Sequence, residues 1–255
     1  MTKIIYDDRV LVKGAVTSSL DSLANELSND PLIKSKVYGM LTERESKQKD
    51  SVKKMLFYDL QELYIKASLS SPEEAYELFK EKLGELTAKH LFYILAENYP
   101  KDSVNHINSM IQTDKNIVLL TKMPLLFFNM VHKKEKNHEF ETAIEKEKLK
   151  VLTPYNFYHK YFPIKEKFEI TPDSIDSALF LQASKEFQEE KSSTLYISSN
   201  LRDVLLMKET IKEDSEDTRM VKHIGSNHPP RCKSLDGCFM DLLELESYAN
   251  NGMKG

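Results

Sequence analysis

Three short apolar stretches, each followed directly by polar side chains, constrain the fold of this chain more than any other feature of its sequence. They occupy residues 3–6, 116–120 and 193–197 and are rich in β-branched and aromatic residues. Such stretches are typical of buried strands, and the segments between them carry apolar residues at helical spacing. Strands that alternate with helices imply crossover connections and a parallel sheet. We therefore predict an α/β protein with a doubly wound parallel-sheet core.

A long helical region separates the first predicted strand from the second. Apolar residues recur every three or four positions in successive segments between residues 17 and 100, which predicts a small helical bundle. The clearest helix start is Ser71-Pro72-Glu73-Glu74, with a capping hydroxyl, a proline and a glutamate three residues after the cap. The predicted domains are an α/β core at 1–14 and 99–213, a helical unit at 15–98 and a C-terminal tail at 214–255.

Composition excludes several functional classes. The net charge of -4 argues against a broad nucleic-acid-binding surface, and no apolar run approaches the roughly 20 residues that span a bilayer. The seven glycines are scattered and form neither a dinucleotide fingerprint nor a P-loop. The two cysteines, Cys232 and Cys238, suit a reducing compartment, and the first residues lack the layout of a signal peptide. We expect a cytoplasmic protein that binds neither nucleic acid nor membrane.

Polar side chains follow three of the predicted strands, where we expect them to meet at one edge of the sheet. These clusters are Asp7-Asp8, Thr121-Lys122 and residues 198–203. Their order resembles the haloacid dehalogenase-like hydrolase superfamily. In that family the first strand ends in a DxD motif, the second motif is Ser or Thr, the third a Lys, and the fourth a pair of acids.

Four segments carry this resemblance, which covers roughly residues 3–212. The first motif is matched with one residue missing between its two aspartates, and the helices of residues 15–98 resemble a family cap inserted after the first strand. The third segment aligns with a lysine-proline-aspartate sequence of the family. In order, the matching segments are residues 6–12, residues 116–121, Thr171-Pro172-Asp173 and residues 195–204.

The resemblance implies a magnesium-dependent phosphomonoesterase that acts on a small phosphorylated metabolite. In such enzymes the first aspartate attacks phosphorus and the second acts as general acid and base. Carried over by position, Asp7 is the nucleophile and Asp8 the acid and base, while Asp7 and Asp203 hold Mg²⁺. The implied substrate-binding residues are Thr121, Lys122 and Thr171.

Three departures weaken the implied chemistry. Thr171 replaces the family's lysine, and Ser199 replaces its metal-binding aspartate. Asp7 and Asp8 are adjacent, and neighbouring strand residues point to opposite faces. We therefore predict weak or no phosphatase activity, or a noncatalytic module that binds a protein or ligand with the same fold. Candidates to supply the missing positive charge from elsewhere are Lys165, Lys167 and Lys185.

Several alternatives remain open from the sequence. Residues 55–61 offer a rival first motif with Asp59 as nucleophile, although their spacing is helical. The acids of the predicted site could equally cap helices or end strands without any chemistry. A purely helical interaction protein and a C-terminal partner-binding tail are further possibilities. A zinc site is less favoured, because the spacing of its candidate ligands matches no common zinc motif: His223, His228, Cys232 and Cys238.

Overall fold

The computed structural model describes eight segments of the chain: residues 3–12, 14–31, 51–134, 138–161, 172–189, 194–211, 220–224 and 238–239. Contacts between residues divide the chain into two compact units. The first, here called the sheet unit, comprises Met1–Lys13, Pro100–Lys122 and His132–Gly255. The second, here called the helical unit, comprises Gly14–Tyr99 and Met123–Val131.

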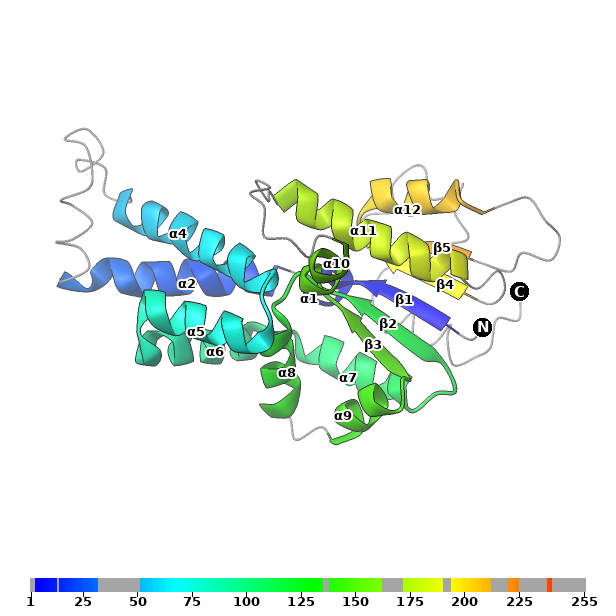
Figure 1. The fold of residues 1–255 in the computed structure, drawn as a ribbon, viewed down its shortest axis with the longest axis horizontal. Coiled ribbons are helices and arrows are strands. Elements are labelled where there is room, and N and C mark those ends of the chain that lie inside the picture. Colours follow the sequence, from blue (N-terminus) through cyan, green and yellow to red (C-terminus); the bar gives the residue numbers. More distant parts are fainter. Residues whose placement is uncertain are drawn as a thin grey trace. The chain divides into compact units, whose positions relative to one another are not determined.

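The sheet unit is built on a parallel sheet, drawn in Figure 1. Within the described residues the strand order is β3-β2-β1-β4-β5-β6, and every neighbouring pair is parallel. Ile4 pairs with Ile117 on one side and Leu195 on the other, so the three apolar stretches form adjacent strands. The predicted α/β class is confirmed, and the purely helical alternative is wrong. The strands are β1 (Lys3–Asp7), β2 (Asn116–Leu120), β3 (Leu149–Leu152), β4 (Thr194–Ser198), β5 (Met220–Ile224) and β6 (Cys238–Phe239).

Helices cover both faces of this sheet (Figure 1). Alternate side chains of a strand point to opposite faces. Tyr6 of β1 contacts His106 of α7, with 3.0 Å between the hydroxyl and Nε2, whereas α11 packs against β1 and β4. On that second face Tyr196 meets Phe187 of α11, with 6.4 Å between ring centroids. The helices of the sheet unit are α1 (Asp8–Val12), α7 (Lys101–Ile111), α9 (His138–Glu145), α10 (Pro154–Tyr161), α11 (Pro172–Glu189) and α12 (Leu201–Lys208).

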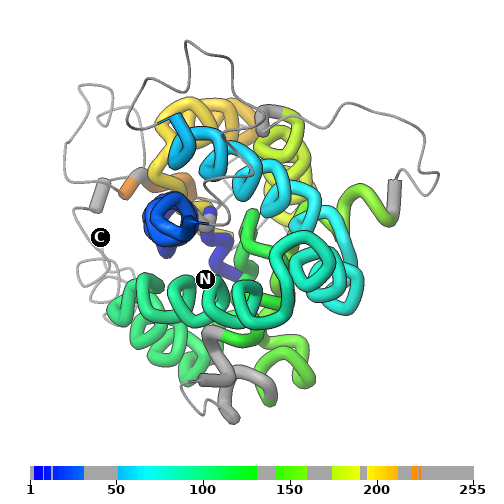
Figure 2. Tube along the Cα trace, turned by 90° about the vertical axis from the view of Figure 1, so that its left-hand side faces the viewer, coloured from blue at the N-terminus to red at the C-terminus, as the bar shows by residue number. Residues whose placement is uncertain are grey.

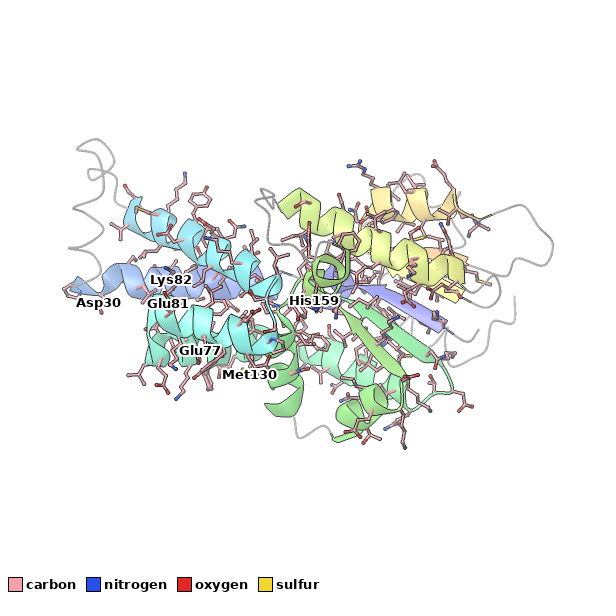
Figure 3. All side chains as sticks on the ribbon, viewed as in Figure 1. Asp30, Glu77, Glu81, Lys82, Met130 and His159 are labelled. Carbon is pink, nitrogen blue, oxygen red and sulfur yellow. The ribbon has the colours of Figure 1, made fainter. Side chains whose placement is uncertain are left out.

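The helical unit is a bundle in which α2 packs on α4 and α6, and α5 packs on α4 and α6. Figure 2 shows α2 nearly end-on beside these helices. The predicted start of α5 is confirmed, since Ser71 Oγ accepts from Glu74 N–H at 3.2 Å and Glu74 Oε2 accepts from Ser71 N–H at 3.1 Å. Glu77, Glu81 and Lys82, labelled in Figure 3, lie on the exposed side of α5. The bundle helices are α2 (Ala15–Asn29), α4 (Ser51–Ser68), α5 (Pro72–Leu83) and α6 (Glu85–Asn98).

Residues 123–131, which we predicted in the core domain, belong to the helical unit. They contain the first turns of α8 (Leu125–Lys134). Phe127 is 1% exposed and lies 4.6 Å from Phe92 and 5.0 Å from Phe79, measured between ring centroids. The physical reason for the difference is therefore a tertiary contact that residue spacing along the chain does not encode.

Residues 214–255, predicted as a tail, contribute two strands to the sheet. β5 pairs with β4 and β6 pairs with β5, both in parallel. Val221 is fully buried and Lys222 is 5% exposed. The sequence hides β5 because a lysine and a histidine interrupt its five residues. The proposed docking helix at 239–245 falls outside the described residues except Phe239, and no helix within the described part is long and apolar enough to cross a membrane.

Candidate functional site

The candidate site is centred on Asp7, the last residue of β1. Asp7 is 7% exposed, and both oxygens of its carboxylate accept hydrogen bonds. Oδ1 accepts from the backbone N–H and from Nε of Arg9, each at 3.0 Å. Oδ2 accepts from Nη2 of Arg9 at 2.6 Å and from the hydroxyl of Ser198 at 3.0 Å. The carboxylate is therefore held by α1 on one side and by the end of β4 on the other.

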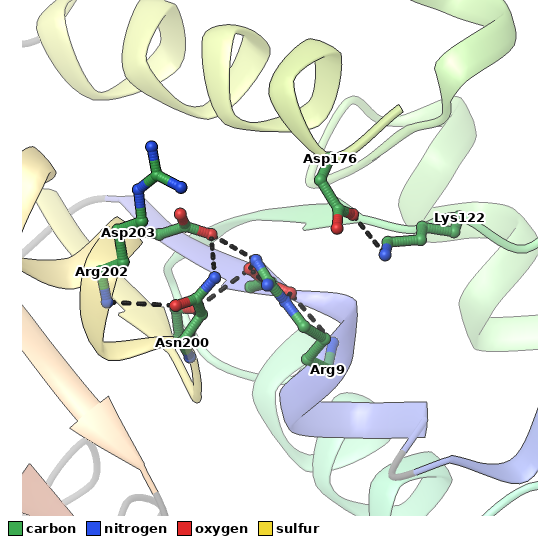
Figure 4. Close-up of polar contacts among 8 residues, drawn as sticks. Arg9, Lys122, Asp176, Asn200, Arg202 and Asp203 are labelled. Carbon is green, nitrogen blue, oxygen red and sulfur yellow. Dashed lines mark hydrogen bonds and ion pairs between the residues drawn. The ribbon is translucent and has the colours of Figure 1, made fainter. Parts of the chain in front are cut away.

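Asp203, in the first turn of α12, faces the same guanidinium (Figure 4). Its Oδ2 accepts from Arg9 Nη2 and from Asn200 Nδ2, the latter at 3.1 Å. Asn200 also caps α12, because its Oδ1 accepts from the backbone N–H of Arg202 at 3.1 Å. Arg9 thus bridges two acids that lie 196 positions apart in the sequence, and the cap of α12 fixes the position of the second one.

Burial and neighbouring charges both shift the pKa values of the site groups. Burial, together with the nearby charges of Asp7 and Asp176, raises the pKa of the Asp203 carboxyl above its usual value, although Arg9 acts to lower it. For Arg9, burial alone disfavours the charged form, but the carboxylates of Asp7 and Asp203 outweigh burial and raise its pKa. Burial, and then the charge of Asp7, raises the pKa of Tyr196. At neutral pH Arg9 is therefore charged and the Tyr196 hydroxyl keeps its proton.

A second ion pair lies beside Asp7. Lys122, just after β2, pairs with Asp176 of α11, and each side chain is 37% exposed (Figure 4). Both line a small cavity together with Asp7, Arg9 and Tyr196. The cavity has a volume of about 10 Å³, which is room for about one water molecule. Each cation of this cavity is therefore already paired with a carboxylate.

The structure brings together three of the predicted site residues, Asp7, Asp203 and Lys122. Thr121 lies at the end of β2, is 2% exposed, and its backbone N–H donates to the carbonyl of Leu152 at 2.9 Å. Asp8 begins α1, but its side chain lies outside the described part of the structure, as does all of Thr171. The roles assigned to these residues remain predictions.

The structure places some of the alternative site residues that the sequence left open. Asp59 lies on an exposed position of helix α4, so it does not end a strand as the rival motif required. Lys185 pairs with Glu189 at 3.9 Å on the exposed side of α11 and does not line the cavity. The other two candidate lysines, Lys165 and Lys167, lie outside the described residues, as do the side chains of all four zinc candidates.

The sequence interpretation missed Arg9. We placed a gap in the first motif so that Asp8 aligned with the family's second aspartate. Without that gap, the residue two positions after Asp7 is Arg9, and its side chain is the one that reaches the Asp7 carboxylate. An ungapped alignment of the first motif, which places Arg9 at the position of the family's second aspartate, would have identified it.

The arrangement does not fit a bound Mg²⁺. Magnesium demands oxygen ligands in near-octahedral geometry and usually takes one or two carboxylates. Here the carboxylates of Asp7 and Asp203 both bind the guanidinium of Arg9. Among the residues that the structure describes, no cluster of three or more His, Cys, Asp or Glu side chains is placed to hold a metal ion.

Comparisons with known proteins give distant structural similarity only. No family model and no curated protein matches the sequence. A solved structure of a HAD family enzyme from Bacteroides thetaiotaomicron matches with a TM-score of 0.42 and 11% sequence identity, over 91% of this chain and 97% of that chain. So distant a similarity assigns neither a family nor an activity to this chain, and the α/β class is established by the sheet itself.

Proposed function

We propose that this protein is a noncatalytic relative of the haloacid dehalogenase-like phosphohydrolases that serves as a binding module. The observation that carries the proposal is the guanidinium of Arg9 between Asp7 and Asp203. A carboxylate nucleophile must present a free oxygen to phosphorus, and a catalytic magnesium needs the same carboxylates. Arg9 binds both acids, so Asp7 can neither attack phosphorus nor help to hold a magnesium ion while these two ion pairs persist.

The order of the strands supports the family part of the proposal. The first motif ends the central strand β1, and its neighbours β2 and β4 carry the second and fourth motifs. Asp7 and Asp203 meet as the family resemblance implies. Since the carboxyl ends of parallel strands meet at one edge in any such sheet, the support comes from the order of the motifs along the strands and from the contact of Asp7 and Asp203 with one guanidinium.

The charge balance of the site disfavours a phosphorylated ligand. A transferring phosphoryl group needs spare positive charge around its oxygens. Arg9 is shared by Asp7 and Asp203, and Lys122 pairs with Asp176, which leaves three acids and two cations. The cavity has room for about one water, so a phosphoryl group would enter only if the side chains that line it moved. Of the two ligand classes that the sequence suggested, we therefore propose a protein partner over a phosphorylated metabolite.

Turnover measurements test this proposal. Wild-type protein and Asp7→Asn are assayed with Mg²⁺ against p-nitrophenyl phosphate and a panel of phosphorylated metabolites, with phosphate release as the readout. We expect no turnover in the wild type above that of Asp7→Asn. Magnesium-dependent turnover that disappears in Asp7→Asn would overturn the proposal and establish the alternative, a working phosphomonoesterase.

A further inference from the structure

The acids of the site share one cation within the chain. The side chains of Asp7 and Asp203 are only 10% and 14% exposed, whereas that of Arg9 is 31% exposed. Two carboxylates buried side by side without a counter-charge are strongly destabilising. A positive group placed between them therefore offsets the cost of keeping both acids ionised.

Both acids contact the same atom of Arg9. Nη2 of Arg9 binds Oδ2 of Asp7 at 2.6 Å and also binds Oδ2 of Asp203. The two oxygens thus converge on a single point, as the ligands of a shared cation do. Protein oxygens lie 2.3–2.6 Å from Ca²⁺ and about 2.0–2.1 Å from Mg²⁺, so a metal ion at the Nη2 position would reach both carboxylates after small shifts.

The surrounding bonds hold the two oxygens in place without help from Arg9. Ser198 donates to Oδ2 of Asp7 at 3.0 Å, and Asn200 donates to Oδ2 of Asp203 at 3.1 Å. Asn200 N–H in turn donates to Ser198 Oγ at 3.0 Å. This chain of hydrogen bonds should keep the acids close together when the guanidinium is removed.

We infer that Arg9 is a built-in counterion that replaces a divalent cation between Asp7 and Asp203. This inference rests on the proposed function and deepens it, because it names the change that removes metal binding from the site. The wild-type protein is then independent of divalent cations, and neutralising Arg9 opens a cation site made of the two carboxylates.

The test compares thermal unfolding of the wild type, Arg9→Gln and Arg9→Gln/Asp203→Asn in EDTA and in MgCl₂ or CaCl₂, at matched ionic strength. Arg202→Gln is the matched control, since it removes one exposed positive charge from the first turn of α12, the helix that carries Asp203, and its side chain bonds neither carboxylate. We expect Arg9→Gln to have a lower Tm in EDTA and to regain about 3 °C or more in about 10 mM cation, as ligand linkage predicts. The wild type, the Arg202→Gln control and the double variant should show no such gain.

Two results would overturn the inference. One is saturable divalent-cation binding by the wild type, detected calorimetrically and lost in Asp203→Asn. The other is an Arg9→Gln protein whose Tm is the same in EDTA and in cation. If Arg9→Gln is unfolded in EDTA, its circular dichroism is followed during titration with CaCl₂, where folding supports the inference and persistent unfolding contradicts it. Absence of turnover in the wild type together with a cation-insensitive Arg9→Gln would reject only this inference, whereas wild-type turnover would reject the proposed function.

Discussion

Arg9 binds both carboxylate oxygens of Asp7, the residue two positions before it in the chain. The bond joins the end of β1 to the first turn of α1, and Arg9 continues across to Asp203 at the start of α12. A guanidinium presents several N–H groups in a fixed plane, which lets it satisfy two carboxylates at once. The same residue thereby ties α1 and α12 to the end of β1 and occupies carboxylate oxygens of both acids.

The raised pKa of Asp203 predicts how stability depends on pH. Burial favours the protonated carboxyl and raises its pKa in the folded chain. Such a group binds protons more tightly when folded, so its contribution to the free energy of unfolding falls as pH rises from about 4 through its raised pKa. Asparagine does not titrate. As pH rises across this range, the free energy of unfolding of Asp203→Asn should therefore increase relative to that of the wild type. Above this range the difference between the two proteins should stay constant.

Urea unfolding of both proteins at several pH values between about 3.5 and 7.5 measures this difference. Asp102→Asn, in the first turn of α7, is the control because it lies on an exposed position away from the site. A difference between Asp203→Asn and wild type that stays flat or shrinks with rising pH would contradict the prediction.

Glu186 of α11 should be a stability determinant at the opposite end of the sheet. It is 7% exposed and pairs with Lys3 at 3.4 Å and also with Lys150. Since Lys3 is itself 9% exposed, Glu186→Gln removes a negative charge that lies 3.4 Å from a buried ammonium. We expect a loss of about 3 kcal/mol in the free energy of unfolding.

The matched control is Glu189→Gln, on the same helix, where the ion pair with Lys185 is 3.9 Å long and half exposed. It should cost at most about 0.5 kcal/mol. Chemical unfolding of both variants decides the matter, and equal losses in the two would show that burial of Glu186 contributes nothing.

The parts of the fold that were predictable from sequence are those coded by local pattern. Ile4, Val118 and Tyr196 lie in continuous apolar stretches whose burial needs a sheet covered on both faces, and they lie in β1, β2 and β4. The site residues Asp7 and Asp203 were found because polar groups after parallel strands meet at one edge. The strands needed only spacing and polarity, whereas the choice of Asp203 within residues 198–203 came from the resemblance to the haloacid dehalogenase-like superfamily.

The parts that were not predictable depend on contacts between distant residues. Lys222 is buried in β5, although a charged residue in a five-residue segment argues against a core strand. Phe127 belongs to the helical unit through its contacts with other rings, which residue spacing does not reveal. Arg9 was overlooked because motif matching looks for the residues that the family's chemistry requires, and an arginine that pairs with Asp7 and Asp203 is not among them.

The capping box at the start of α5 gives a prediction about local stability. Ser71→Ala removes the acceptor for the Glu74 N–H and should lower the free energy of unfolding by about 1 kcal/mol. Ser71→Asp keeps an acceptor at the same position and should retain most of the wild-type stability. Thermal unfolding monitored by circular dichroism separates the two, and equal losses in both variants would contradict a capping role.

Phe127 tests whether residues 123–131 stabilise the helical unit. Its ring is stacked on Tyr64 with 5.9 Å between centroids and lies closer still to Phe79 and Phe92. Phe127→Ala should therefore cost about 3–5 kcal/mol, since it leaves a cavity among three aromatic side chains. Leu86→Ala is the control, because Leu86 is 83% exposed and its loss should cost less than about 0.5 kcal/mol. Hydrogen exchange adds the decisive readout: protection should fall in α4, α5 and α6 of Phe127→Ala before it falls in β1 and β2, and unchanged protection in the bundle would assign α8 to the sheet unit instead.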